Sequence, residues 1–243
     1  MKLSIEQTAT AYDEHHVLDN RLTLEWYPQR IARLTQGRSI LELGLGHGIS
    51  TAYFAPRFSR YQVIDGSAEM IARFRERFDI GNVDIVEAYF EDFETDERFD
   101  CIVMGFVLEH VEEPGLVLDR YRRFLVPGGA VFVTVPNAES LHRRIGHAAG
   151  LLPEIDQLSN VDREFGHRRY FTLDSLKRLA TDAGYDVVAA EGLLLKPVTT
   201  GQLEKLALSE SVLQALLTVG VDYPELCNSL LLKLVPRADG HGG

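Results

Sequence analysis

The sequence predicts a doubly wound α/β fold built on a seven-stranded, mostly parallel sheet. Short apolar runs alternate along the chain with amphipathic stretches of helical period, and Gly or Pro residues separate many of them. Strands and helices that alternate in this way form βαβ units with right-handed crossovers and a parallel sheet. The length of 243 residues fits one domain of this class.

The predicted strands and helices follow each other at short intervals. Pro114 suits the first turn of one helix, while Thr172 can cap another and Gly184 can end it. The last strand follows no crossover of ordinary length, so we expect it to insert antiparallel beside its predecessor. Strands are expected at 39–43, 60–64, 83–86, 99–104, 130–135, 185–191 and 229–235, and helices at 47–58, 67–78, 114–125 and 172–183.

Three segments lie outside this alternation and predict helical additions to a single domain of residues 1–236. Residues 1–35 are expected to form a helical cover of the sheet, and residues 137–171 and 192–228 are long enough to be lids over a substrate. Leucines on one face of 202–219 predict a helix that either closes the substrate pocket or forms a homodimer contact. Residues 237–243 predict a disordered tail.

Composition and charge narrow the class of protein. The net charge of −11 disfavours a long nucleic acid as substrate, because phosphate backbones bind basic surfaces. No apolar run is long enough to predict a membrane span, and the first residues lack the apolar segment of a secretory signal. Cys101 and Cys227 form no C-x-x-C pair and predict reduced thiols in a cytoplasmic protein.

A glycine-rich turn after the first predicted strand is the strongest local signal. Glu42, Gly44, Gly46 and Gly48 follow an E-x-G-x-G-x-G pattern between a strand and a helix, where open α/β sheets bind ligands. A dinucleotide motif would read G-x-G-x-x-G, with space for a pyrophosphate. The early third glycine and the preceding acid instead suit a ligand with a positively charged amino group and no phosphate. A glycine turn without a ligand is the alternative.

A second signal stands at the end of the next predicted strand. Asp65 occupies this position, and a carboxylate there can accept hydrogen bonds from both ribose hydroxyls of a nucleoside. Its alternative role is to cap the helix that begins near Ser67. The glycine turn and Asp65 together predict a nucleoside-type cofactor.

Four segments, matched in order and spacing, resemble the class I S-adenosylmethionine-dependent methyltransferases, nearest the ubiquinone-biosynthesis O-methyltransferases. They are the glycine turn, Ile64-Asp-Gly-Ser-Ala-Glu-Met70, Val107-Leu-Glu-His-Val-Glu-Glu-Pro114 and Leu125-Val-Pro-Gly-Gly-Ala-Val-Phe132. The motifs are specific for the cofactor and only weakly specific for the substrate. The resemblance implies a Rossmann-like fold, S-adenosylmethionine as methyl donor and S-adenosylhomocysteine as product.

The resemblance also implies positions for the cofactor. Its methionine part would meet Gly44 and Gly46, with Glu42 near the amino group, and Asp65 would hold the ribose. The alternative role for Phe90 and Met104 is core packing. The alternative role for Tyr12 is a hydrophobic contact with the sheet. Further cofactor contacts are expected from Tyr12 and Gly48, from Gly66 and Met70 beside the adenosine, from Phe90, Glu91 and Asp92 near the adenine, and from Met104 and Gly105 along the methionine chain.

One departure from the related sequences disfavours a metal. Some ubiquinone-type members bind a divalent ion through Glu-x-x-Glu-His, but the first of these positions is Phe106 here. Only Glu109 and His110 remain, and two ligands make a poor metal site. We therefore expect no metal.

Two histidines are candidates for the catalytic base that takes a proton from the methyl acceptor. His110 follows the fourth predicted strand. His167 lies in Phe165-Gly-His-Arg-Arg-Tyr-Phe171, which resembles a stretch that borders the substrate pocket in related small-molecule methyltransferases. Arg168 and Arg169 could bind a carboxylate or phosphate of the substrate, with Tyr170 beside them. The alternatives are a structural histidine for His110 and a buried lid anchor for the later stretch.

The predicted function is direct SN2 transfer of a methyl group from S-adenosylmethionine to an oxygen or nitrogen atom of a small molecule. Oxygen is favoured by the resemblance alone. The alternatives are an RNA or protein methyltransferase, a non-catalytic cofactor-binding protein on the same fold, and a dinucleotide-dependent oxidoreductase. No membrane partner is expected, and a homodimer stays open.

Overall fold

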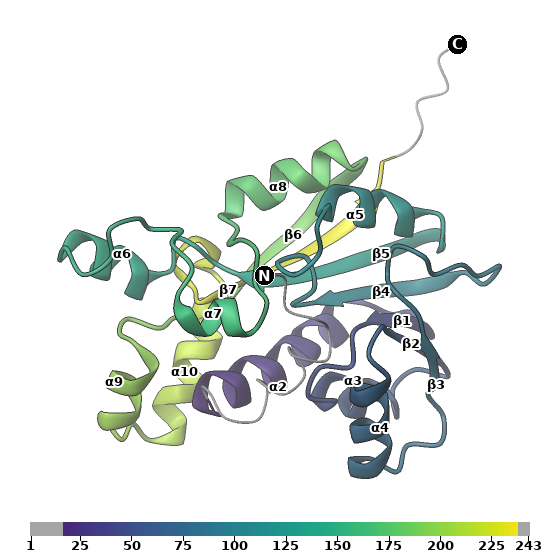
Figure 1. Cartoon of the computed structure of the whole chain (residues 1–243), viewed down its shortest axis with the longest axis horizontal. Coiled ribbons are helices and arrows are strands. Elements are labelled where there is room, and N and C mark those ends of the chain that lie inside the picture. Colours follow the sequence, from purple (N-terminus) through teal and green to yellow (C-terminus); the bar gives the residue numbers. More distant parts are fainter. Residues whose placement is uncertain (1–16, 238–243) are drawn as a thin grey trace.

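A computed structural model describes residues 17–237 and contains one seven-stranded sheet (Figure 1). Its strands lie in the order β3-β2-β1-β4-β5-β7-β6. Neighbouring strands pair in parallel except β7, which is antiparallel to both β5 and β6. The predicted fold class and the antiparallel last strand are therefore confirmed. The strands are β1 (Ser39–Leu43), β2 (Arg60–Asp65), β3 (Asp84–Glu87), β4 (Phe99–Gly105), β5 (Leu125–Pro136), β6 (Tyr185–Leu193) and β7 (Ser229–Pro236).

Helices cover both faces of the sheet and create two apolar cores. Side chains alternate along each strand, so in β4 Ile102 and Met104 enter the first core, while Cys101 and Val103 enter the second. The first core is closed by α5 (Pro114–Arg122) and α8 (Leu173–Asp182), and the second by α2 (Val17–Leu34), α3 (Ile49–Phe54) and α4 (Ala68–Arg77).

The two long insertions fold into short helices beside the sheet. Residues 137–171 contain α6 (Leu141–Ala148) and α7 (Asn160–Glu164), and residues 192–228 contain α9 (Thr200–Lys205), α10 (Glu210–Gly220) and the 3₁₀ helix η1 (Pro224–Leu226). Leu213 and Leu217 of α10 are buried in the second core. This leucine face therefore packs within its own chain.

The boundary between α5 and β5 differs from the sequence prediction. The helix ends at Arg122, and β5 begins before Pro127-Gly-Gly rather than after it. Leu125 pairs with Phe99, and a register shift follows in β4. Proline and glycine are tolerated here because they lie in the irregular part of the strand.

The described part of the N-terminal segment is the single helix α2. The predicted structure of residues 1–16 and the predicted tail at 238–243 lie outside the described residues. Among residues 17–237, no helix combines the length and the apolar character needed to cross a membrane.

Candidate functional site

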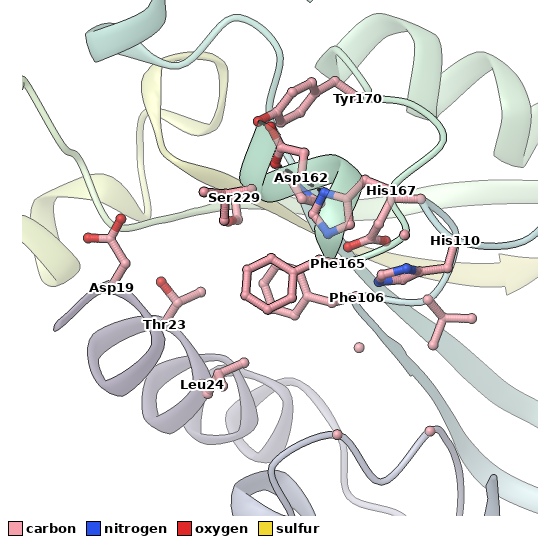
Figure 2. A pocket seen from close by; sticks show the side chains of 18 of the residues that line it. Asp19, Thr23, Leu24, Phe106, His110, Asp162, Phe165, His167, Tyr170 and Ser229 are labelled. Atoms are coloured by element: carbon pink, nitrogen blue, oxygen red, sulfur yellow. Dashed lines mark hydrogen bonds and ion pairs between the residues drawn. The ribbon is translucent and has the colours of Figure 1, made fainter. Parts of the chain in front are cut away.

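A large cavity opens at the carboxyl ends of the parallel strands. Its volume is about 1060 Å³, above the ~300–1,000 Å³ typical of a pocket for one small ligand. Its walls come from the loops after β1, β2, β3 and β4, from α2, and from the inserted segments around α6, α7 and α9 (Figure 2). The strand order reverses between β1 and β4, where open α/β sheets bind ligands. The cavity therefore has room for a cofactor and a second molecule.

The glycine turn forms one wall of this cavity. Gly44, Gly46 and Gly48 have φ values of 80°, 47° and 73°, in the left-handed region that favours glycine. Gly44 and Gly46 lie on the wall, whereas Gly48 caps α3 away from it. A Cβ atom on Gly48 would lie 2.5 Å from the Phe78 ring and 2.7 Å from the Phe74 ring. Gly44 and Gly46 are thus placed to meet a ligand, while Gly48 serves the turn and its packing.

Alanine at Gly48 is expected to destabilise the protein more than alanine at Gly46. Both replacements place a Cβ atom at positive φ, which costs about 1–2 kcal/mol. Only the Cβ atom of Gly48→Ala also meets two aromatic rings. The free energy of unfolding of Gly48→Ala should therefore be about 2 kcal/mol lower than that of Gly46→Ala. Urea denaturation measures both values. Equal losses for the two variants would show that the turn accommodates a side chain at Gly48.

Asp65 is fixed at the end of β2 by neighbouring backbone groups. Its Oδ2 accepts a hydrogen bond from the Leu45 N–H and its Oδ1 accepts one from the Ser67 N–H, both at 2.8 Å. The residue is 8% exposed and lies on the cavity wall. A carboxylate oxygen can accept more than one hydrogen bond, so this group is oriented to take hydroxyl donors from the cavity. Gly66 and Met70 lie on the same wall.

Glu42, which was predicted to lie near the cofactor, is buried behind the cavity wall. Its buried carboxylate accepts hydrogen bonds from the hydroxyls of Thr51, at 2.6 Å, and Tyr61. Burial raises the pKa of Glu42, and these hydrogen bonds oppose that shift. Strand side chains alternate, so Glu42 shares the face of Ile40, in the second core. Glu42 therefore ties β1 to α3 and β2.

The loop after β3 and the last residue of β4 contribute three of the predicted cofactor residues to the wall. These are Phe90, Glu91 and Gly105. Asp92, the fourth residue predicted in this region, is exposed and does not line the cavity. Tyr12 falls outside the described residues.

Met104 lies in the core, whereas Tyr27, to which the sequence assigned no individual role, lies on the cavity wall. Met104 is fully buried in the first core, because it shares a strand face with Ile102, and its predicted cofactor contact is corrected to core packing. Tyr27 of α2 lies on the wall beside Gly105, where an added Cβ would come within 2.7 Å of the Tyr27 hydroxyl oxygen. Burial raises the pKa of Tyr27, so the hydroxyl keeps its proton. Tyr27 belongs to the N-terminal segment that was expected to form a helical cover, and no individual role was predicted for it.

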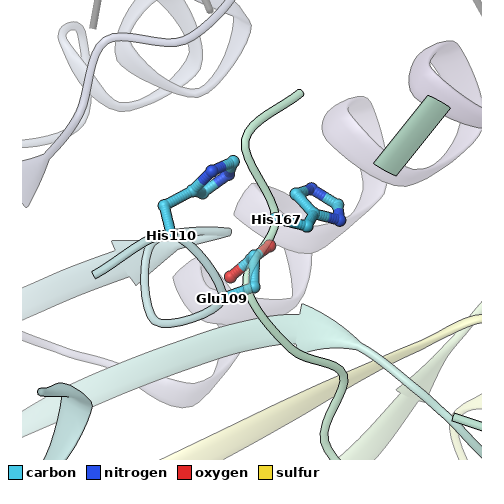
Figure 3. Close-up of side chains that lie close together, drawn as sticks. All are labelled: Glu109, His110 and His167. Atoms are coloured by element: carbon cyan, nitrogen blue, oxygen red, sulfur yellow. The ribbon is translucent and has the colours of Figure 1, made fainter. Parts of the chain in front are cut away.

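Glu109, His110 and His167 form a compact group on the cavity wall (Figure 3). The two imidazole rings meet edge to face with centroids 4.8 Å apart. Glu109 is fully buried, and in the described part of the chain neither of its carboxylate oxygens has a hydrogen-bond partner. Burial raises the pKa of Glu109 to about 7 and lowers that of His110 to about 3. The structure thus brings the two predicted histidines together beside a carboxyl group.

This group of three side chains alters the basis of the metal prediction. The expectation of no metal depended on Glu109 and His110 alone. His167 adds a third side chain whose donor atom lies within 4.8 Å of the other two. Three donor side chains and one open position are the usual composition of a catalytic zinc site. The number of donors therefore no longer argues against a metal.

Asp162 is a site residue that the sequence analysis missed. Its Oδ1 lies 3.2 Å from Nδ1 of His167, while its Oδ2 accepts hydrogen bonds from Ser159 N–H at 2.7 Å and from the Tyr170 hydroxyl at 2.8 Å. Burial alone would raise the pKa of Asp162, but the close His167 ring and the hydrogen bonds from Ser159 and Tyr170 outweigh it and hold the pKa well below its usual range. The sequence signal was Ser159-x-x-Asp162, a capping box at the start of α7.

The two arginines of the His167 segment have different surroundings. Arg168 lies on the cavity wall, and its guanidinium donates to Glu112 at 3.0 Å. Arg169 points away from the cavity and donates to the backbone carbonyls of Leu108, Val111 and Glu112. Its predicted substrate contact is therefore corrected: Arg169 holds the loop that carries His110. Tyr170 reaches the wall with its hydroxyl engaged by Asp162.

Replacing Glu109 by glutamine is expected to change how stability depends on pH. The pKa of Glu109 rises from 4.5 to about 7 on folding, so its contribution to stability is full below pH 4.5 and is lost as the pH rises to 7. Relative to Glu109→Gln, the wild type should lose about 3 kcal/mol of unfolding free energy over this interval.

Urea denaturation at several pH values measures this difference. The lowered pKa of His110 makes the unfolding free energy rise with pH between pH 3 and 6.5, opposite to the effect of Glu109. This contribution is present in both proteins, so it cancels in the difference. His167 and Asp162, which also face Glu109, are likewise present in both. A difference in stability that does not vary with pH would contradict the prediction.

One family model and several known proteins are similar to this chain. Residues 15–190 match the model of a methyltransferase domain. The cypemycin N-terminal methyltransferase of a Streptomyces species is 30% identical over 120 residues, which cover 48% of this chain and 49% of that protein. The ubiquinone/menaquinone biosynthesis C-methyltransferase UbiE of Escherichia fergusonii is 29% identical over 191 residues, or 71% of this chain and 74% of that protein. The chain thus spans about half the length of the first of these relatives.

A solved structure shows the same fold. It is the 1,6-didemethyltoxoflavin-N1-methyltransferase of Burkholderia thailandensis with bound 1,6-didemethyltoxoflavin and S-adenosylhomocysteine. The TM-score is 0.62 at 17% identity, and the match covers 96% of this chain and 86% of that one. At this identity the likeness concerns the fold alone.

Proposed function

The chain belongs to the S-adenosylmethionine-dependent methyltransferases, and we propose that it methylates an oxygen or nitrogen atom of a small molecule. The observation that carries this proposal is a single cavity, of about 1060 Å³, that continues from the glycine turn to a lid of inserted helices. A cavity of this size accommodates a second small ligand beside the cofactor. A long RNA would instead need a basic surface, and the net charge of −11 gives no general support for one.

The wall residues support a specific orientation of the cofactor in this proposal. Asp65, held by two backbone N–H groups, would accept the ribose hydroxyls. Gly44 and Gly46 would allow close approach of the methionine part, and Glu91 lies on the wall where the adenine is expected. This orientation leaves the histidine side of the cavity for the methyl acceptor.

When bound, S-adenosylmethionine supplies a methyl carbon activated by a positively charged sulfur. We assign His167 as the catalytic base and Asp162 as the residue that positions it. Asp162 faces Nδ1 of His167, so the other ring nitrogen can take the proton of the acceptor O–H or N–H. The acceptor lone pair forms the new bond to carbon as the carbon–sulfur bond breaks. His110, kept neutral by its lowered pKa, forms the adjacent wall.

Labelled methyl transfer tests the proposed substrate class. The protein is incubated with methyl-labelled S-adenosylmethionine and either a metabolite extract or a fraction of RNA and protein. The proposal predicts label in a low-mass product, and much less of it at the same cofactor concentration when Asp65→Ala replaces the wild type. Label confined to RNA or protein would contradict it and favour a macromolecular acceptor.

A further inference from the structure

A second polar group lies in the same cavity, apart from the histidines. This far polar cluster consists of Asp19 and Thr23 from α2 and of Lys196 and Thr200 from the segment that follows β6. All four residues line the cavity, and each is between 4% and 8% exposed. Figure 2 shows Asp19 and Thr23 on one side and His110 on the other, with the rings of Phe106 and Phe165 between them.

The hydrogen bonds of the far polar cluster leave two polar atoms unused. Asp19 Oδ2 accepts hydrogen bonds from Lys196 Nζ and from the Thr200 hydroxyl, and Lys196 also donates to Thr200 at 3.1 Å. Asp19 Oδ1 and the Thr23 hydroxyl have no partner among residues 17–237. Buried polar atoms without a partner are unfavourable, so native structures rarely keep them without a reason. Both residues line the cavity, and the two atoms themselves have almost no exposed surface.

The surrounding charges favour a neutral ligand group. Asp19 and Lys196 compensate each other, so a charged group buried beside them would have no counter-charge. His142 is also neutral, because burial and the nearby Lys196 lower its pKa to about 3. Arg143 also lines the cavity and stays charged, but its guanidinium is already bonded to the backbone carbonyls of Ile155 and Gln157 and packed against the Tyr170 ring.

The chemistry of the two unused atoms specifies the group further. Asp19 Oδ1 can only accept a hydrogen bond, whereas the Thr23 hydroxyl can donate or accept. A hydroxyl or a carboxamide satisfies both atoms, since each has a donor and an acceptor. The aromatic residues between this cluster and His110 suit an apolar, ring-containing body.

We propose that the far polar cluster binds a neutral hydroxyl or carboxamide at the end of the acceptor molecule that is remote from the methylated atom. This inference rests on the proposed function, because it assumes that a small acceptor occupies the cavity. The acceptor is then an elongated molecule with a reactive O–H or N–H at one end, an apolar body, and a neutral hydrogen-bonding group at the other end.

Four matched compounds test this inference on the full chain saturated with S-adenosylhomocysteine. They are 2-phenylethanol, propylbenzene, 2-phenylethylammonium and 3-phenylpropionate, which differ in the terminal group of one side chain. Ligand-observed NMR gives the four dissociation constants. In the wild type, 2-phenylethanol is expected to bind more tightly than either charged compound.

Variants at Thr23 separate binding from folding. In Thr23→Val, the dissociation constant of 2-phenylethanol divided by that of propylbenzene should rise about fivefold, because the alcohol loses one hydrogen bond. Thr23→Ser should leave this ratio at its wild-type value. The valine variant removes a buried hydroxyl that has no partner in the described chain, so its melting temperature should be no lower than that of the wild type. Thr218→Val, at an exposed position of α10, is the matched control.

Three results would overturn the inference. They are tightest binding of a charged compound in the wild type, an unchanged ratio in Thr23→Val, and no binding of any of the four compounds at millimolar concentration. Its failure is distinct from failure of the proposed function. If label is transferred to a small product but Thr23→Val leaves the ratio of dissociation constants unchanged, only the binding role of the far polar cluster is rejected. Label transfer only to macromolecules with a changed ratio rejects the small-molecule function and leaves the cluster as a binding site.

Discussion

Replacing His167 by alanine is expected to lower kcat for methyl transfer by a factor of about 10²–10⁴, the usual contribution of a positioned acid–base group. The acceptor proton then has no side chain to receive it beside the reacting atom. The dissociation constant of S-adenosylhomocysteine should stay close to the wild-type value, because the glycine turn and Asp65 are untouched. Steady-state kinetics with the labelled cofactor and calorimetry measure the two quantities.

Two controls make this result specific. His147→Ala removes an exposed histidine that contacts the Leu152 carbonyl and should leave kcat unchanged. A chelator should also leave the wild-type rate unchanged, since a neutral imidazole accepts a proton without a metal. A rate lost with the chelator and restored by zinc would show that Glu109, His110 and His167 act through a metal. Wild-type kcat in His167→Ala would remove His167 from the mechanism.

Replacing Asp65 by alanine is expected to weaken the binding of S-adenosylhomocysteine by a factor of about 10² or more. Two hydrogen bonds from ribose hydroxyls to a charged acceptor would be lost, each worth ~1.5–3 kcal/mol. The variant also leaves the Leu45 and Ser67 N–H groups without their acceptor. Calorimetric titration gives the dissociation constant.

Stability must be measured alongside this binding experiment. Asp84→Ala, which removes an exposed carboxylate from β3, is the control and should bind the cofactor product normally. Asp65→Asn retains one carbonyl acceptor and should show a smaller loss of affinity. A folded Asp65→Ala protein with wild-type affinity would contradict the assignment of Asp65 to the ribose.

The fold and one end of the cavity could be predicted because they depend on local pattern. The period of apolar residues distinguishes strands from helices. The turn after the first strand is visible in the sequence because its positive φ values need glycine. Asp65 could be placed because carboxyl ends of neighbouring parallel strands meet at one edge of the sheet. These inferences need no knowledge of how distant segments pack.

The departures of Glu42 and Met104 from their predicted places beside the cofactor have a common physical cause. Both side chains point into a core, because alternation along the strand places Glu42 with Ile40 and Met104 with Ile102. The motif gave the correct location along the chain but not the direction of the side chain. Attention to strand alternation could have identified both positions.

The remaining site residues depend on contacts between distant segments. Lys196 meets Asp19 across 177 positions of sequence, and Tyr27 reaches Gly105 from a helix that precedes the sheet. Asp162 is close to His167 in sequence, but only the turn after α7 brings their side chains together. No local pattern distinguishes such residues from ordinary polar positions on helices.

The position of S-adenosylhomocysteine in a crystal of this protein tests the account most directly. We predict that the ribose hydroxyls bond to the Asp65 carboxylate and that the sulfur faces the space beside His110 and His167. The remaining cavity, toward Asp19 and Thr23, should stay open for the acceptor. A ribose away from Asp65, or a sulfur turned away from both histidines, would contradict the proposed division of the cavity between cofactor and substrate.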